Sequence, residues 1–408
     1  MTSFSRVSVN NWRQFSDVNI DLNSKVTVIT GSNGSGKTTL LNLVSRHFGW
    51  NWTFVSTPWM GKRTAKRIWS DIFQRGETSF DEKDMQSSSQ RRKIGEIKYN
   101  NDARCELMTQ TVTGPQYHPE YLGLQAVDGL HIPSHRPVAT YHGIQNIPAE
   151  PITSAQQYQK YQSLLNNAFG AGRAENPGKI QKESLISLAL MGEGNSHVPG
   201  NIAMKEAFEG FQEVLRRTLP KTLGFERIEI RMPEVVLVCR SGTFPMDAMS
   251  GGVSAIFSIV WQIFMFGHEK EEFTITIDEP ENHLHPALQR NLLPSLANAF
   301  PNCKFIVATH SPFIVSSFPE AKIFALSPGR DQKITASLLS ENDISGTPNE
   351  LLRSIFDVDS ILPIWVEDAV KKIIVETQDL PSEEKTTEIM RRLADLGLAD
   401  SIVEYRGK

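Results

Sequence analysis

The sequence has few cysteines, and their small number excludes folds that are held together by disulfides or by cysteine-bound zinc. Its 408 residues contain three cysteines, Cys105, Cys239 and Cys303, which lie far apart and form no C-x-x-C pair. This pattern fits neither a disulfide framework nor a cysteine-based zinc site, and it is typical of a reducing compartment. A chain of this length predicts a large core domain with an insertion or appendage.

Long apolar runs and an excess of one charge are also missing. A membrane-spanning helix needs about 18 or more apolar residues, whereas the richest run, residues 255–266, is interrupted by Ser258 and Gln262. The N-terminus lacks the apolar stretch of a signal peptide, so we expect a cytoplasmic protein. The net charge of -4 neither favours nor excludes DNA binding, and any basic patch must be local.

The most informative feature that is present is a phosphate-binding loop. Residues 31–39 read GSNGSGKTT, a complete G-x-x-x-x-G-K-[ST] motif between an apolar strand at 25–30 and a helix at 38–46. Glycines let backbone N–H groups surround phosphate oxygens at the positive end of a helix. Lys37 is expected to reach the β- and γ-phosphates and the Thr38 hydroxyl to bind Mg²⁺. The expected ATP contacts from this loop are Gly31, Asn33, Gly34, Ser35, Gly36, Lys37, Thr38 and Thr39.

A second apolar strand, predicted at residues 273–277, runs into Asp278 and Glu279. Nucleotide hydrolysis needs an acidic group at a strand end to hold Mg²⁺ and a neighbouring carboxylate to polarise water. We assign Asp278 to the metal and Glu279 to general base catalysis. His283 and His285 follow closely, and without a third ligand nearby they are better explained as local structure than as a metal site.

Two further motifs complete a resemblance to a known superfamily. Residues 248–252 read AMSGG before a long apolar helix, and residues 304–312 read KFIVATHSP. In this order and spacing, the four motifs resemble the ABC-type ATPases of the RecF/SMC/OLD class. Residues 278–286, DEPENHLHP, are similar to OLD-like AAA ATPases of bacterial anti-phage systems, such as OLD, Septu and PARIS. The resemblance covers about residues 1–55 and 245–340.

The resemblance implies several further roles. Ser250, Gly251 and Gly252 would form the signature loop that faces a γ-phosphate, with Met249 and Val253 departing from the usual spelling. His310 would be the switch histidine that senses the γ-phosphate, and Arg13, in the opening segment NNWRQF, would lie near the phosphates. No Q-loop glutamine can be placed, and His135 and Arg136 are weaker substitutes. Each site would be completed by two subunits, so a homo-oligomer of at least a dimer is expected.

The resemblance implies an α/β fold: an ABC-type P-loop ATPase with a mixed sheet, an antiparallel side-sheet and a short helical insertion. The expected divisions are an ATPase lobe at 1–150, a helical arm at 151–225, a second lobe at 226–345 and a C-terminal segment at 346–408. Residues 94–132 show strand-like alternation and 152–220 show helical patterns. Residues 81–93 predict a polar tip. Its Arg91, Arg92 and Lys93 could contact nucleic acid, but a solvated loop explains them better.

The C-terminal segment resembles the start of a TOPRIM nuclease. Residues 361–375 would be its opening strand and helix, with Glu367 as the catalytic glutamate at the strand end. The chain ends before any D-x-D pair that such a site also needs for Mg²⁺. Either the domain is a vestige or the resemblance is accidental, and in both cases we expect no nuclease activity. We interpret residues 382–398 as an amphipathic docking helix.

Three functions remain open. The preferred one is an ATP- and Mg²⁺-dependent sensor or switch that controls a separately encoded effector, such as a nuclease or toxin, in anti-phage defence. The alternatives are a DNA-binding ATPase of repair or chromosome maintenance, and a scaffold held together by ATP. A transporter subunit is least compatible with the opening strand and the OLD-like acidic motif.

Overall fold

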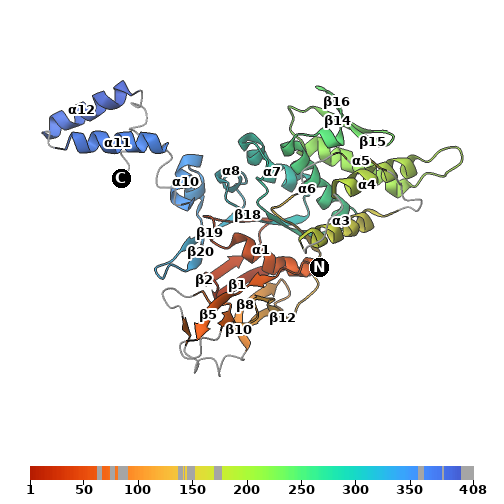
Figure 1. Ribbon diagram of the computed structural model, residues 1–408. Coiled ribbons are helices and arrows are strands. Elements are labelled where there is room, and N and C mark those ends of the chain that lie inside the picture. The colour runs from red at the N-terminus through yellow and green to blue at the C-terminus, as the bar shows by residue number, and fades with distance from the viewer. Residues whose placement is uncertain are drawn as a thin grey trace. The chain divides into compact units, whose positions relative to one another are not determined.

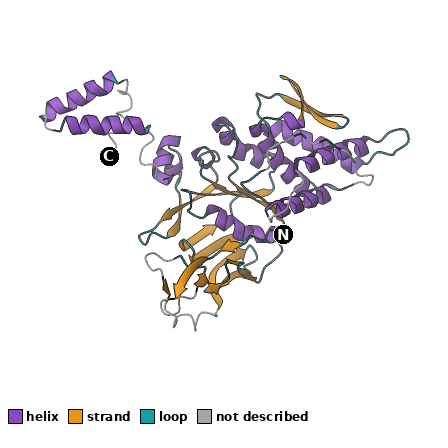
Figure 2. Ribbon diagram, viewed as in Figure 1, coloured by secondary structure: helices purple, strands orange, loops and turns teal. Residues whose placement is uncertain are grey.

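The computed structural model places an eleven-stranded mixed sheet at the centre of the protein (Figures 1 and 2). It describes residues 1–61, 67–73, 79–80, 91–136, 141, 143–144, 152–169, 177–356, 363–378 and 381–396. These residues divide into a larger unit, Met1–Pro348, and a smaller one, Asn349–Lys408. The predicted boundaries near residues 150 and 225 both fall inside the larger unit.

One half of the sheet is parallel and carries the apolar strands predicted from the motifs. The strand order here is β19-β3-β18-β17-β13, and each adjacent pair is parallel. The strands are β3 (Val26–Gly31), β13 (Gly129–Ile132), β17 (Phe273–Asp278), β18 (Cys303–Thr309) and β19 (Lys322–Pro328). Because β3 and β17 are buried at every position, they read as continuous apolar runs, as strands covered on both faces do.

The other half is the expected antiparallel side-sheet, and it is continuous with the parallel half. Its order is β12-β9-β8-β1-β2, and each adjacent pair is antiparallel. Strand β20 connects the two halves, because it pairs in parallel with β2 and antiparallel with β19. The strands are β1 (Phe4–Trp12), β2 (Phe15–Asp21), β8 (Arg91–Tyr99), β9 (Arg104–Gln110), β12 (Glu120–Leu122) and β20 (Ile334–Leu338). One sheet therefore connects the phosphate-loop strand to the N-terminal strands.

Three small sheets flank the main one. The first contains β5 (Thr57–Gly61), β6 (Arg67–Ser70), β7 (Ser79–Phe80) and β10 (Val112–Thr113). The second pairs β4 (Phe54–Val55) with β11 (Gln116–Tyr117). The third contains β14 (Phe225–Arg231), β15 (Glu234–Cys239) and β16 (Gly242–Pro245).

Helices cover the parallel half. Helix α1 (Lys37–Ser45) packs on β3, β17 and β18 through buried Leu40, Leu41 and Leu43, and a 3-10 turn, η1 (Arg46–Phe48), follows it. The longest apolar run forms α6 (Gly251–Gly267), which packs against β13 and is the buried helix expected from the sequence. A 3-10 turn, η2 (Met246–Ala248), precedes α6, and α7 (Pro286–Ala299) and α8 (Pro312–Val315) follow β17 and β18.

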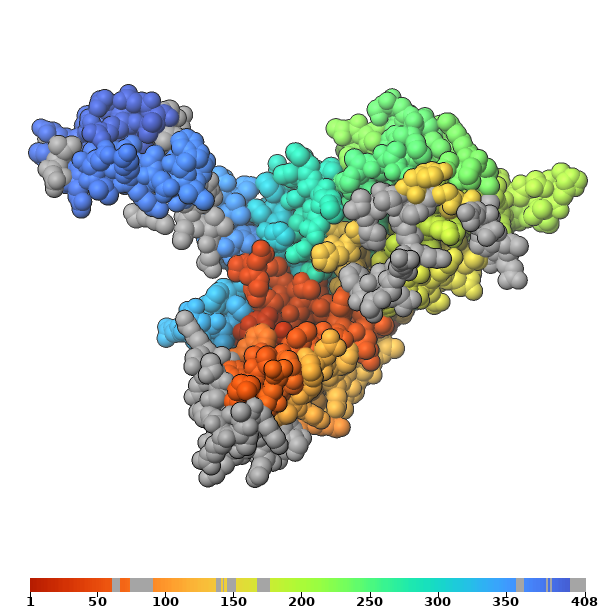
Figure 3. All heavy atoms as spheres, in the orientation of Figure 1, coloured from red at the N-terminus to blue at the C-terminus, as the bar shows by residue number. Residues whose placement is uncertain are grey.

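The insertion is helical, as expected. It comprises α3 (Ser154–Phe169), α4 (Pro177–Glu193) and α5 (Ile202–Thr218). Helices α3 and α5 pack on α6, and α4 packs on α3 and α5. The turn between α4 and α5 projects from the body of the larger unit (Figure 3), and residues 196–200 are exposed.

The smaller unit corrects one expectation. After the short helix α9 (Glu341–Ile344) of the larger unit come α10 (Pro348–Phe356), α11 (Ile364–Glu376) and α12 (Ser382–Asp395). Glu367 lies in the first turn of α11, so it does not end a strand and the TOPRIM-like interpretation is wrong. Val366, Val370 and Ile373 form a buried cluster with Leu393 of α12, and this helical spacing outweighs the β-propensity of the segment. In the described residues, no helix is long and apolar enough to cross a membrane.

Candidate nucleotide-binding site

The phosphate loop connects β3 to α1 and depends on glycine at two positions. Gly36 precedes α1 with φ 99°, and a Cβ there would lie 2.4 Å from Cζ of Phe15. Gly31 has φ 144°, and a Cβ there would lie 2.4 Å from the Leu326 carbonyl oxygen. Only glycine fits this combination of left-handed backbone and close approach. Asn33 and Gly34 are exposed at the tip of the loop, whereas Ser35 is buried.

Lys37 lies beneath the loop that it is expected to serve. Its Nζ donates to the carbonyl oxygens of Gly31 at 2.9 Å and Ser32 at 3.1 Å. Burial lowers the pKa of Lys37, while the carboxylates of Glu279, Asp278 and Glu281 act in the opposite direction. Lys37 is therefore already in the field of three carboxylates that lie on the far side of the loop.

Thr38 and Asp278 meet directly. The Thr38 hydroxyl donates to Oδ2 of Asp278 at 2.9 Å, although 240 residues separate them. Asp278 is 2% exposed, and burial, together with the Glu279 and Glu281 charges, raises its pKa to about 6 against the effect of the Thr38 bond. Its Oδ1 has no hydrogen-bond partner among the described residues. A buried, unpartnered carboxylate oxygen beside an exposed threonine hydroxyl fits a Mg²⁺ ligand pair.

Among the described residues, no group of three or more metal-binding side chains occurs. Mg²⁺ sites commonly use one or two protein ligands and complete their shell with water and substrate phosphates, and Thr38 and Asp278 would be those two ligands.

Glu279 and His310 lie together beside Asp278. Glu279 adopts φ 46°, and Asn282 Nδ2 donates to its Oε2 at 3.0 Å. His310 Nδ1 lies 3.6 Å from Glu279 Oε1 and 3.3 Å from Glu281 Oε1. The structure thus brings the predicted general base and the predicted switch histidine to the carboxyl ends of adjacent strands.

Glu281 is a site residue that sequence reasoning missed. Its Oε1 accepts from the Thr309 hydroxyl at 2.7 Å and from the His310 backbone N–H at 2.9 Å. These bonds join the turn after β17 to the end of β18 and fix the backbone of His310. The available signal was the second glutamate in DEPE, which lies two positions beyond Glu279.

Arg136, considered above as a weak Q-loop substitute, packs against the same turn. Its Nη2 donates to the Glu279 carbonyl oxygen at 2.9 Å, while Nε and Nη1 have no hydrogen-bond partner among the described residues. Burial lowers the pKa of Arg136, and Glu281, Asp278 and Glu279 oppose that shift. A buried cation therefore supports the turn that carries the acidic residues, whereas His135 is exposed.

The predicted signature residues lie at the start of α6. Ser250 is the N-cap residue and is exposed, and its hydroxyl makes no capping hydrogen bond to the amides of this helix. A Cβ on Gly252 would lie 3.3 Å from the His283 carbonyl oxygen, so this loop packs beside the turn after β17. The hydroxyl and the exposed Gly251 face outward, which leaves a helix N-terminus available to an anion.

Two comparisons with protein families match the chain on either side of the insertion. Residues 6–50 match an AAA domain, and residues 240–316 match an AAA domain described with the AbiEii toxin of type IV toxin–antitoxin systems. The chain is 35% identical over 111 residues to "Retron Ec83 probable ATPase" of Escherichia coli, which covers 27% of this chain and 19% of that protein. It is 32% identical over 111 residues to "OLD nuclease" of Thermus scotoductus, covering 26% and 21%.

In residues 6–50 and 240–316 the chain is thus similar to ATPases of the AAA class. It is also 24% identical over 151 residues to "Septu protein PtuA" of Bacillus mycoides, covering 35% of this chain and 21% of that protein. The matches thus span about a fifth of the length of these relatives. Among solved structures, the SMC head domain from Thermotoga maritima aligns with a TM-score of 0.43 and 11% identity over 83% of this chain and 99% of that chain.

Arg13, a predicted nucleotide contact, and His285, which was explained as local structure, both have defined contacts in the structure. The Arg13 guanidinium donates to the Val55 carbonyl oxygen at 3.0 Å and lies over the Phe73 ring at 4.6 Å, and a role near the phosphates stays a prediction. His285 is the N-cap of α7 and accepts from the Ala287 N–H. His285 is thus a helix cap, in agreement with the local-structure interpretation.

The basic residues expected on a polar tip of the ATPase lie in β8. Arg92 pairs with buried Asp71 at 2.8 Å, and Lys93 pairs with Glu96 and Glu106. Arg91 pairs with Glu120. Residues 91–93 thus belong to a paired strand and not to a loop, and each cation has a carboxylate partner, while contact with nucleic acid stays a prediction; residues 81–90 lie outside the described residues.

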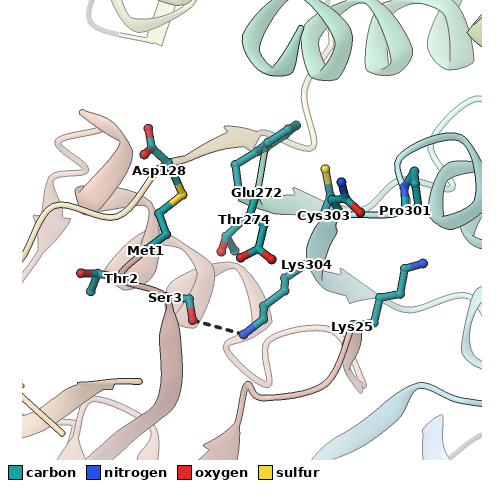
Figure 4. Close-up of a pocket in the computed structure, with 12 residues that line it drawn as sticks. Met1, Thr2, Ser3, Lys25, Asp128, Glu272, Thr274, Pro301, Cys303 and Lys304 are labelled. Atoms are coloured by element: carbon teal, nitrogen blue, oxygen red, sulfur yellow. Dashed lines mark hydrogen bonds between the residues drawn. The ribbon is translucent and has the colours of Figure 1, made fainter. Parts of the chain in front are cut away.

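The ATPase also has a cavity of about 310 Å³ that is separate from this site. It lies where β17 and β18 begin and is lined by Lys25, Lys304 and Glu272, with Lys304 donating to Ser3 Oγ (Figure 4). Ligands of open α/β sheets bind at the carboxyl ends of the strands. This cavity is at the opposite ends, so it is not the nucleotide site.

Proposed function

We propose that this chain binds and hydrolyses ATP, assembles through ATP sites shared between copies, and acts as a nucleotide-dependent switch for a separately encoded effector in anti-phage defence. The observation that carries the proposal is the Thr38–Asp278 hydrogen bond. It joins the phosphate loop to the acidic strand end, and this contact supports the shared Mg²⁺ role of Thr38 and Asp278.

Each residue has a separate part in the proposed reaction. The loop amides and Lys37 hold the phosphates, and Thr38 and Asp278 hold Mg²⁺. When bound, the metal offsets the negative charge that develops on the phosphates. Glu279 accepts a proton from water, and the bond from Asn282 keeps its carboxylate oriented. His310, held through Glu281, responds to the presence of the γ-phosphate.

The proposed sharing of sites rests on the exposure of the signature loop. A single phosphate loop leaves the outer side of the γ-phosphate open. Ser250 and the N-terminus of α6 carry an exposed hydroxyl and a positive helix end. A second copy that presents this surface to the bound ATP would close the site, and hydrolysis would release the contact. ATP binding and assembly would then be one equilibrium.

The defence role is supported by the names of the similar proteins, which belong to retron, Septu and OLD systems. In our proposal, the ATP-dependent assembly holds or releases an effector protein whose activity lies on another chain. Arg91, Arg92 and Lys93 each have a carboxylate partner, which weakens the case for DNA contact by these three residues.

The first experiment measures the mass of the purified protein in solution with and without ATP and Mg²⁺. We compare wild type, Glu279→Gln and Lys37→Met. Removing a general base slows the reaction by about 10²–10⁴-fold, so Glu279→Gln should accumulate the ATP-bound assembly. Lys37→Met should not assemble because it loses the phosphate contact.

The exposed Glu320→Gln provides a matched control with the same chemical change. It should assemble and hydrolyse ATP like wild type. A mass that ignores ATP in all four proteins would contradict the shared-site proposal. An unchanged hydrolysis rate in Glu279→Gln would refute the assignment of the base.

A further inference from the structure

A buried charge network joins the helical insertion to the signature loop. Lys182 of α4 is 0% exposed. Its Nζ donates to Asp247 Oδ2 at 2.7 Å and to the carboxylate of Glu234. Asp247 lies in η2, three residues before Ser250, whereas Glu234 begins β15. One lysine therefore connects the insertion to the turn that precedes the predicted γ-phosphate contact.

The charge on Lys182 is maintained in this position. Burial lowers its pKa, but the hydrogen bonds and charges of Asp247 and Glu234 together outweigh that effect and raise it. The ring of Tyr141 lies 5.2 Å from Nζ, and the Tyr141 hydroxyl donates to Glu234 at 3.2 Å. A buried ion pair of this kind is a poor source of stability compared with apolar packing, and its best-attested use is to fix one arrangement among alternatives.

Neighbouring polar contacts act on the same pair of helices. Gln181 Nε2 donates to Ser258 Oγ at 3.1 Å, and Trp261 Nε1 donates to Ser184 Oγ at 2.9 Å. These four residues are on α4 and α6, and three of them are less than 6% exposed. Satisfied buried polar networks make the register between two elements specific. Helix α4 and the signature helix therefore have one defined relative position.

We propose that Lys182 is a positioning residue that holds the signature turn through Asp247, so that the placement of Ser250 depends on the position of the insertion. Contacts made by a partner with the insertion would then change ATP-dependent assembly without touching the phosphate loop. The expected effect on ATP-dependent assembly rests on the proposed function, but the positioning of the signature turn can be measured without nucleotide.

The experiment compares Asp247→Asn with Glu234→Gln in the full chain. Both changes remove one carboxylate from the same lysine, and only Asp247 precedes the signature loop. Amide hydrogen exchange of peptides covering residues 246–254 is measured without nucleotide. Exchange should be about tenfold faster in Asp247→Asn, the change expected for losing a coupling of ordinary size between neighbouring groups, and near wild type in Glu234→Gln.

Assembly provides the second readout. In the Glu279→Gln background, Asp247→Asn should weaken ATP-dependent assembly while the Kd of a fluorescent ATP analogue stays near the parent value. Lys182→Met should likewise weaken assembly and leave the Kd of the ATP analogue near the parent value. Lys179→Met on the same helix, with a partly exposed side chain, should not weaken assembly. If Lys182→Met fails to fold, the two carboxylate variants still decide the question.

The outcomes separate the two proposals. Equal exchange at residues 246–254 in Asp247→Asn and Glu234→Gln overturns the positioning role, whatever assembly does. Selective loosening in Asp247→Asn supports it, even if the Glu279→Gln parent fails to assemble with ATP. That last result would count only against the proposed function.

Discussion

Asp278→Asn should make the nucleotide-free protein more stable near neutral pH while abolishing its response to Mg²⁺. Asp278 is 2% exposed and its pKa is raised from 3.8 to about 6. The native state therefore binds this proton more tightly than the unfolded state, and the stability of wild type falls as pH rises from about 4 to about 6. Asparagine carries no charge and does not suffer this loss.

The size of the effect follows from the pKa shift. A shift of about two units corresponds to about 3 kcal/mol at pH 8, where both states of the carboxyl are ionised. At pH 5 the same calculation gives about 1.5 kcal/mol, because the native carboxyl is still mostly protonated. The variant should therefore gain about 1.5 kcal/mol more at pH 8 than at pH 5. Thr38 can still donate to the amide oxygen at position 278.

Urea unfolding in EDTA, followed by tryptophan fluorescence, measures this difference. Six of the seven tryptophans lie in the larger unit, the exception being Trp365, so the signal reports on the part that contains the site. Asp17→Asn, at an exposed position of β2, is the matched control and should show no such pH dependence. Adding Mg²⁺ and ATP should stabilise wild type but not Asp278→Asn. The reasoning would be refuted if Asp278→Asn were less stable than wild type at pH 8. It would also be refuted if the free energies of unfolding of the variant and wild type differed by the same amount at pH 5 and pH 8.

Three further predictions concern the loop, its helix and the switch residue. Gly36→Ala should lose ATP binding in a direct binding assay and cost roughly 1–3 kcal/mol, because the new Cβ would meet Phe15 at a left-handed backbone position; normal ATP affinity would contradict this view of the loop. Leu40→Ala should lower the free energy of unfolding by about 2–5 kcal/mol, since Leu40 is fully buried between α1 and the sheet, and exposed Asn33→Ala is its control. His310→Ala should keep ATP affinity but lower kcat by about a hundredfold, the typical effect of losing one polar contact to the charge that develops in the transition state; a change in KM alone would count against the switch role.

Much of the site was predictable because its parts lie at strand ends. Apolar runs that end in Asp278 and His310 identify two strands, and parallel strands that end at one edge of a sheet bring such residues together. The strand–loop–helix around Lys37 was equally clear, because the motif fixes the local geometry. The fold class followed from the same elements, and the structure confirms it.

Other contacts could not be predicted, since they depend on how loops and helices cross. Arg136 reaches the turn after β17 from a segment 143 residues earlier, and no local pattern encodes that pairing. Lys182 has an ordinary helical neighbourhood in sequence, and its burial depends on Asp247 and Glu234, which lie far along the chain. Ile364–Glu376 was mistaken for a strand start because its branched apolar residues have high β-propensity, although their spacing is helical.

The position of β3 in the sheet has a consequence for biosynthesis. Both neighbours of this strand, β18 and β19, come from residues 303–328, whereas β3 itself is complete by residue 31. A ribosome making this chain therefore releases the phosphate loop long before any strand can pair with β3. Contacts this distant in sequence slow folding and leave strand edges exposed in the meantime. Chains that end before residue 303 should consequently be unable to bind ATP, because the strand that carries the phosphate loop would lack both of its neighbours.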